Sequence, residues 1–205
     1  MKKVLAFVLL IMAVTNINAE LYKDIAPLDS LGDIKAKLPN ASYESVKAAW
    51  VTESDALYKI TGHGLSGTII VKFYDSRPYF KKMLQNTTED QDNTALIELA
   101  GRSDDEALSV SWVRWVPDTM IPLDRFILKY GAAEESGFDD QDMSPYKAWT
   151  KRGLTAYLSD NGKYVIRVDY EFTITEQRKA WKERRGFIPE WLQIVESKST
   201  KKTKK

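Results

Sequence analysis

The dipeptide Asn161-Gly162 lies between two strand-like segments and constrains the fold more than any other feature of the sequence. So short a turn joins neighbouring strands only in antiparallel orientation. We expect a three-residue loop with Gly162 in a left-handed conformation, because this register pairs Leu158 with Tyr164 and places the apolar side chains on one face. The expected apolar face carries Leu154, Ala156, Leu158, Tyr164, Ile166 and Val168, and the opposite face carries Thr155, Tyr157, Val165, Arg167 and Asp169.

In other segments the apolar residues recur with the spacing of a strand or of a helix. A β-branched and aromatic run over 68–74 and an alternating run over 107–116 predict two further strands. Apolar spacing predicts helices at residues 28–38, 123–130 and 175–185, and shorter helices after Ser76 and Pro189.

Two parts of the chain contain the same features in the same order. Pro27-Leu28-Asp29 and Pro122-Leu123-Asp124 each begin a helical segment, which is followed by a polar stretch, a tryptophan (Trp50 or Trp149) and strand-like sequence. The spacings differ between the two parts, so chance similarity of short anchors is the alternative to a diverged repeat. We therefore predict an α+β fold with an antiparallel sheet or sheets, flanking helices and, as one interpretation, two diverged helix-plus-strands repeats.

The predicted organisation has five parts. They are a signal peptide (1–19), a first α+β unit (20–84), a polar connector with a short helix (85–106), a second α+β unit (107–197) and a disordered basic tail (198–205).

The N-terminus has the pattern of a cleavable secretory signal. Lys2 and Lys3 precede an apolar run from Val4 to Val14, and Ala19 provides the small residue expected before a cleavage site. An uncleaved anchor is the alternative, but about 11 apolar residues are fewer than the roughly 20 that span a bilayer. We therefore expect a periplasmic or secreted protein with no transmembrane segment after cleavage.

Composition excludes several chemistries. With Cys 0 and His 1, the chain has no thiol nucleophile, no cysteine ligands for zinc or iron–sulfur clusters, and no histidine-rich metal site, so we expect neither cofactor nor metal. Seven of the 30 basic residues are lysines at the two ends, which leaves a mildly acidic body. The tail has no interleaved aromatic residues, so no specific nucleic-acid partner is expected.

Two local motifs resemble known sites without their structural context. Gly62-His63-Gly64-Leu65-Ser66-Gly67 has the spacing of a dinucleotide-binding loop, but a strand follows it where that loop requires a helix. His63 is expected in a solvated turn, with a ligand-contacting or pH-sensitive loop as the alternative. Asp139, Asp140 and Asp142 lack the spacing of a calcium loop and are interpreted as a soluble loop.

Candidate binding residues come from the predicted strand faces. Trp112 shares a face with Leu108 and Val110 and is expected in the core, whereas Trp115 is expected on the opposite, exposed face, with packing beneath the connector as the alternative. Tryptophan and arginine are enriched at binding hot spots. We select five binding residues and no catalytic residue: Trp115, Arg114, Tyr157, Arg167 and His63.

The double helix-plus-strands pattern resembles the tandem-repeat fold of the β-lactamase inhibitor proteins and of small periplasmic lipoproteins that assist outer-membrane assembly. The likeness rests on Pro27-Leu28-Asp29 with Trp50, and on Pro122-Leu123-Asp124, Gly131, Trp149, Gly153-Leu154 and Asn161-Gly162. It implies an α+β sheet that binds protein. The chain lacks the disulfides of the inhibitors and the lipidated cysteine of the lipoproteins.

The sequence therefore favours an exported, non-enzymatic module that contacts a protein or envelope component through a sheet face. A carboxylate-dependent hydrolase of the cell envelope is the alternative function. A third hypothesis is a surface binder that acts through the lysine-rich tail.

Overall fold

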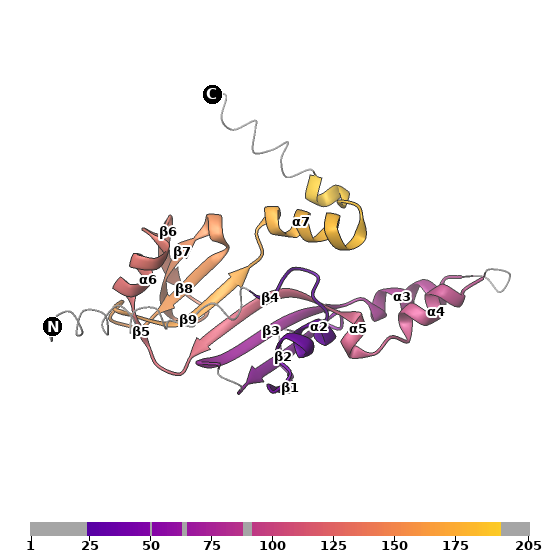
Figure 1. Ribbon diagram of the computed structural model, residues 1–205, viewed down its shortest axis with the longest axis horizontal. Helices are drawn as coiled ribbons and strands as arrows, with labels where there is room; N and C mark the ends of the chain where they lie inside the picture. The colour runs from indigo at the N-terminus through magenta and orange to yellow at the C-terminus, as the bar shows by residue number, and fades with distance from the viewer. Residues whose placement is uncertain (1–23, 50, 63–64, 88–91, 194–205) are drawn as a thin grey trace, which may run out of the picture.

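Nine antiparallel strands form one sheet in the computed structural model, which describes residues 24–49, 51–62, 65–87 and 92–193 (Figure 1). The order is β1-β2-β3-β4-β9-β8-β7-β6, and the short β5 also pairs with β9. The strands are β1 (Ser42–Val46), β2 (Asp55–Thr61), β3 (Gly67–Asp75), β4 (Leu108–Pro117), β5 (Ile121–Pro122), β6 (Glu135–Asp139), β7 (Ser144–Trp149), β8 (Leu154–Leu158) and β9 (Tyr164–Glu171).

The described α-helices lie mainly where the sequence predicts them. They are α2 (Leu31–Lys37), α3 (Arg77–Gln85), α4 (Thr94–Ala100), α5 (Asp104–Ala107), α6 (Leu123–Tyr130) and α7 (Ile174–Arg185). Residues 190–193 are also helical, after Pro189 as predicted. None of the helices within the described ranges has the length and apolarity needed to cross a bilayer.

The α+β class and the antiparallel sheet are therefore confirmed, and the two halves share one sheet. Each half contains a helix followed by a four-stranded meander, with α2 before β1–β4 and α6 before β6–β9; α3, α4 and α5 are inserted between β3 and β4, and α7 follows β9. The repeat itself stays a prediction. Pairing assigns β4 to the first meander, because β4 pairs with β3 from Gly67 to Asp75. The predicted signal peptide and tail lie outside the described residues.

The predicted hairpin exists, but its predicted register is wrong. Gly162 has the expected left-handed conformation, with φ 67°. Leu158 pairs with Val165 and Tyr157 pairs with Arg167, so Ile166 has no partner and forms a β-bulge. The bulge keeps three apolar residues of β8 on the buried face together with Val165 and Val168 of β9.

A second β-bulge lies in β4. Lys72 pairs with Trp112 and Phe73 pairs with Val110, so Ser111 has no partner; its hydroxyl donates a 3.1 Å hydrogen bond to the carbonyl of Lys72. Because a bulge adds one residue to the alternation, it exchanges the predicted faces of the two tryptophans. Trp115 is only 5% exposed within the core, and Trp112 is half-buried on the other face.

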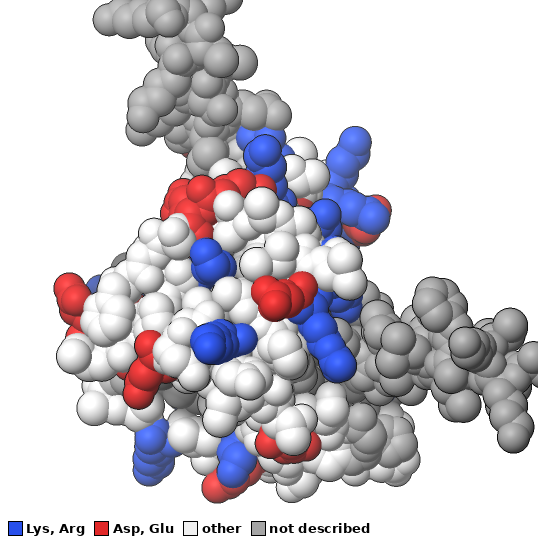
Figure 2. Space-filling model, turned by 90° about the vertical axis from the view of Figure 1, so that its left-hand side faces the viewer, with Lys and Arg blue, Asp and Glu red and all other residues white. Residues whose placement is uncertain are grey.

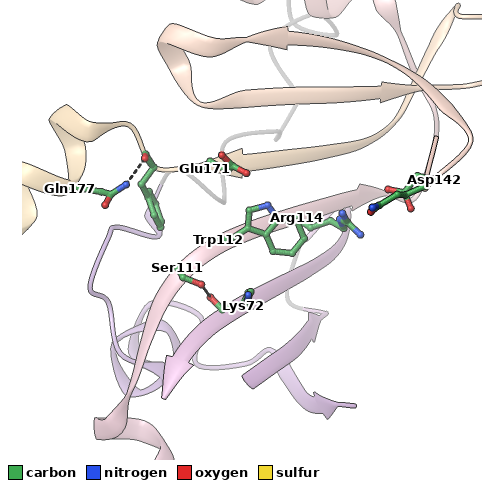
Figure 3. Close-up of a pocket in the computed structure, with 9 residues that line it drawn as sticks. Lys72, Ser111, Trp112, Arg114, Asp142, Glu171 and Gln177 are labelled. Carbon is green, nitrogen blue, oxygen red and sulfur yellow. Dashed lines mark hydrogen bonds between the residues drawn. The ribbon is translucent and has the colours of Figure 1, made fainter. Parts of the chain in front are cut away.

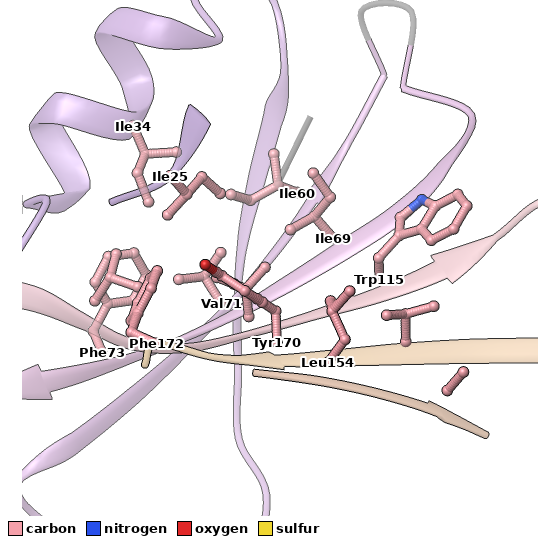
Figure 4. Close-up of a cluster of buried hydrophobic side chains, with 14 of the residues drawn as sticks. Ile25, Ile34, Ile60, Ile69, Val71, Phe73, Trp115, Leu154, Tyr170 and Phe172 are labelled. Atoms are coloured by element: carbon pink, nitrogen blue, oxygen red, sulfur yellow. The ribbon is translucent and has the colours of Figure 1, made fainter. Parts of the chain in front are cut away.

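Helices α2 and α6 contribute to the core on one face of the sheet, which we call the core face. Ile34 of α2 belongs to one buried cluster with Ile69 and Val71 of β3 (Figure 4). Phe126 of α6 belongs to the same cluster. Trp149 belongs to the same cluster and is held at the end of α6, because its indole N–H donates a 2.9 Å hydrogen bond to the carbonyl of Gly131. We call the opposite side, with Lys72, Trp112 and Arg114, the outer face.

Helices α3 and α4 form an arm that extends from the end of the sheet (Figure 1). Its base is fixed by Arg77, whose guanidinium pairs with Asp75 and Asp104, both at 2.7 Å. Burial alone would raise the pKa of Asp75, but hydrogen bonds from Arg77 outweigh burial and lower it. The base of the arm therefore has a defined position beside the sheet.

Two left-handed glycines, Gly153 and Gly162, allow a matched test of how closely β9 packs against the chain before β8. A Cβ at Gly153 would lie 1.8 Å from the carbonyl oxygen of Glu171, whereas a Cβ at Gly162 would meet nothing within 4 Å. We expect Gly162→Ala to cost about 1–2 kcal/mol from the left-handed backbone alone. Gly153→Ala should cost several kcal/mol more, because the β9 backbone has to move. Urea unfolding of both variants measures the difference, and equal losses would contradict the close approach of β9 to Gly153.

Candidate functional site

Three of the five predicted binding residues lie together on the outer face. Arg114 of β4, Tyr157 of β8 and Arg167 of β9 meet there because Tyr157 is paired with Arg167 and Arg114 with Asp169. Trp115 is wrongly predicted as exposed, since the β4 bulge turns it into the core. His63 lies outside the described residues.

Arg114 connects the two meanders across the centre of the sheet. Its Nε and Nη2 atoms each donate a 2.8 Å hydrogen bond to Asp169, one to either carboxylate oxygen. The same guanidinium lies over the indole of Trp112, 4.6 Å from the ring centroid. Burial opposes the charge of Arg114, but its hydrogen bonds to Asp169 outweigh burial and raise the pKa of the guanidinium.

Arg167 forms the second part of this group of side chains. We call the group the outer-face cluster; it consists of Trp112, Arg114, Asp142, Tyr157, Arg167 and Asp169. Its guanidinium lies 3.4 Å from the ring centroid of Tyr157 and pairs with Asp142 at 2.5 Å. Asp139 holds the turn that carries Asp142, because its carboxylate accepts the backbone N–H groups of residues 141 and 142. Burial, followed by the nearby charge of Asp169, raises the pKa of Tyr157, which therefore keeps its phenolic proton at neutral pH.

A polar hollow of about 720 Å³ lies beside this cluster (Figure 3). Strands β3 and β4, the start of α7 and the turn between β6 and β7 contribute to its lining. Trp112 lies between Lys72 and Glu171 in this view. The lining residues are Lys72, Ser111, Trp112, Arg114, Gln141, Asp142, Glu171, Phe172 and Gln177.

The pKa shifts of the carboxyl groups bear on acid–base chemistry. A general acid at neutral pH needs a carboxyl group with a raised pKa. Among the described residues, every carboxyl group with a resolved shift has a lowered pKa, and hydrogen bonds contribute in each case; these groups are Asp33, Asp55, Asp75, Asp92 and Asp139. The described ranges also contain no group of three or more acidic or histidine side chains placed to hold a metal ion.

Charge on the end of the molecule that carries α6 and β6 is mixed. Figure 2 shows acidic and basic side chains interspersed there, without a continuous basic patch. Nucleic-acid-binding surfaces instead gather lysine and arginine on one face. This end of the molecule therefore lacks that electrostatic feature.

Sequence reasoning missed Trp112, Asp169 and Asp142 as members of the cluster. Trp112 was missed because strict alternation assigns it to the core. The sequence places Asp169 on the same face as Tyr157 and Arg167. It does not identify the partner of Asp169, because Arg114 is 55 residues away in the chain. No local signal connects Asp142 with Arg167.

The Arg114–Asp169 pair can be tested with a double-mutant cycle. Arg114→Met leaves a largely buried carboxylate without its bidentate partner, so we expect a loss of about 2 kcal/mol or more in the free energy of unfolding. The double variant Arg114→Met/Asp169→Asn should lose less than the sum of the single variants, because it leaves no unpaired charge. Urea unfolding of all four proteins gives the coupling energy, and strictly additive losses would show that the pair does not act as a unit.

Comparison of the chain with protein-family models, with curated proteins and with solved structures found no match, so its function has to be inferred from its own geometry.

Proposed function

We propose that the protein is an exported, non-enzymatic binding module that contacts a protein or another envelope component through the outer face of its sheet. One observation carries this proposal. Two arginines, a tryptophan and a tyrosine from three neighbouring strands gather beside an open hollow, and these residue types dominate binding hot spots.

Contacts within the protein also hold the side chains of the cluster in place. Arg114 and Arg167 are each held by a carboxylate on one side and an aromatic ring on another. Side chains that are already fixed lose little conformational entropy on binding, so more of the contact energy contributes to affinity. The resemblance to envelope-associated and inhibitor proteins is consistent with this function.

The export part of the proposal has its own test. We expect the chain purified from its host to begin at Glu20, because cleavage after Ala19 removes the apolar N-terminal segment. Mass spectrometry of the N-terminus, together with cell fractionation, measures this. Recovery of the intact N-terminus in the cytosol would overturn export and leave the sheet-face proposal to be judged separately.

Binding through the outer face is tested by capture from envelope extract followed by titration with the purified partner. Trp112→Ala should weaken the partner about 30-fold, the loss expected for a hot-spot tryptophan worth about 2 kcal/mol. Tyr79→Ala is the matched control, since Tyr79 is an exposed aromatic residue on α3, away from the polar hollow.

An equal loss of affinity in both variants, or unchanged affinity of Trp112→Ala, would show that the partner does not bind through the outer face. Recovery of no partner under native extraction would count against a binding module altogether. Circular dichroism of each variant separates loss of binding from loss of folding.

A further inference from the structure

A second hollow, of about 600 Å³, lies between α7, the arm and the loop before α2. We call it the apolar hollow. Its volume falls within the range of small-molecule sites. Aliphatic and aromatic side chains dominate its lining, which consists of Pro27, Leu28, Tyr74, Ser76, Phe80, Leu99, Arg102, Ser109, Val110, Ser111, Phe172, Gln177, Trp181, Arg185, Phe187 and Trp191.

Large aromatic side chains remain exposed at this hollow. Phe187 is 55% exposed and Trp191 is 56% exposed. The segment that carries them is held in place, because the guanidinium of Arg178 donates to the carbonyl of Leu192 at 2.5 and 3.0 Å and Leu192 is itself buried. Exposed aromatic groups on an anchored segment indicate a surface that a ligand covers.

The opposite wall is equally well defined. Phe80 of α3 and Leu99 of α4 reach the hollow from the arm. Arg77 fixes the base of the arm through Asp75 and Asp104, and it also donates to the carbonyl of Arg102 at 3.3 Å. The hollow therefore lies between two anchored elements.

Charge selects the type of ligand. The lining contains two charged residues, Arg102 and Arg185, and neither an aspartate nor a glutamate. In the described part of the chain, no carboxylate forms an ion pair with either arginine. Apolar walls with two unpaired arginines complement a molecule that has an apolar chain and an anionic head.

We propose that the apolar hollow binds one acyl chain of an anionic amphiphile, whose headgroup pairs with Arg102 and Arg185. This site is separate from the outer-face cluster and does not depend on the proposed protein-binding function.

Two probes of equal chain length and opposite charge test the proposal on the full chain, purified as expressed. Sodium myristate and tetradecyltrimethylammonium bromide are titrated below their critical micelle concentrations, with calorimetry and tryptophan fluorescence as readouts. Myristate should saturate at one molecule per chain. The cationic probe should bind at least about tenfold more weakly, since one charge-assisted hydrogen bond is worth about that factor.

Matched variants locate the site. Arg185→Glu and Trp191→Ala change exposed residues of the hollow, and each should weaken myristate binding about tenfold, within the range expected for a charged hydrogen bond or a buried apolar side chain. Arg125→Glu and Leu128→Ala change exposed residues of α6 and should leave binding unchanged.

Equal affinity for the two probes, the absence of saturation below micelle formation, or equal losses in the α6 controls would overturn the proposal. Binding seen only with vesicles of phosphatidylcholine and phosphatidylglycerol would overturn it in favour of a membrane surface. A dimer that dissociates in Trp191→Ala, without myristate binding, would overturn it in favour of a second copy of the chain.

Discussion

The pairing of β4 with β9 is the contact on which the rest of the architecture depends. It joins the two meanders, and it runs from Trp112 opposite Glu171 to Trp115 opposite Val168. Arg114 and Asp169 face each other within this pairing. A slip of one residue would carry the carboxylate of Asp169 to the core face without a cation, at a cost of several kcal/mol. The ion pair therefore favours the observed register of β4 against β9.

The two β-bulges determine which side chains the outer face presents. Without the bulge at Ser111, Trp112 would point into the core together with Val110, and Trp115 would lie outside. Without the bulge at Ile166, strict pairing in the hairpin would place Val165 and Val168 on opposite faces. Each bulge thus keeps the apolar side chains before and after it on the core face. The polar side chains of the cluster lie on the outer face as a result.

The sequence predicted what local chemistry determines. Asn161-Gly162 specified the hairpin, and Gly131 and Gly186 marked the ends of helices α6 and α7, because turns and helix ends depend on a few adjacent residues. The bulges were not predictable, since a bulge exists only relative to a partner strand that a single sequence does not identify. For the same reason the sequence placed Tyr157 and Arg167 on one face of the hairpin but did not connect them with Arg114, and Trp115 was selected in place of Trp112.

The polar hollow and the apolar hollow are adjacent, because both are lined by Ser111, Phe172 and Gln177. The hydrogen bond from the Gln177 amide to the carbonyl of Phe172, at 2.8 Å, lies at their common boundary. Trp112 lines the polar hollow and Trp191 lines the apolar one, and neither lines both. Each tryptophan therefore reports on one hollow, whereas a substitution at Phe172 or Gln177 would change both. Because the shared boundary consists of the β4 bulge at Ser111, Phe172 just after β9, and Gln177 in the first turn of α7, a ligand large enough to displace α7 would alter both hollows together.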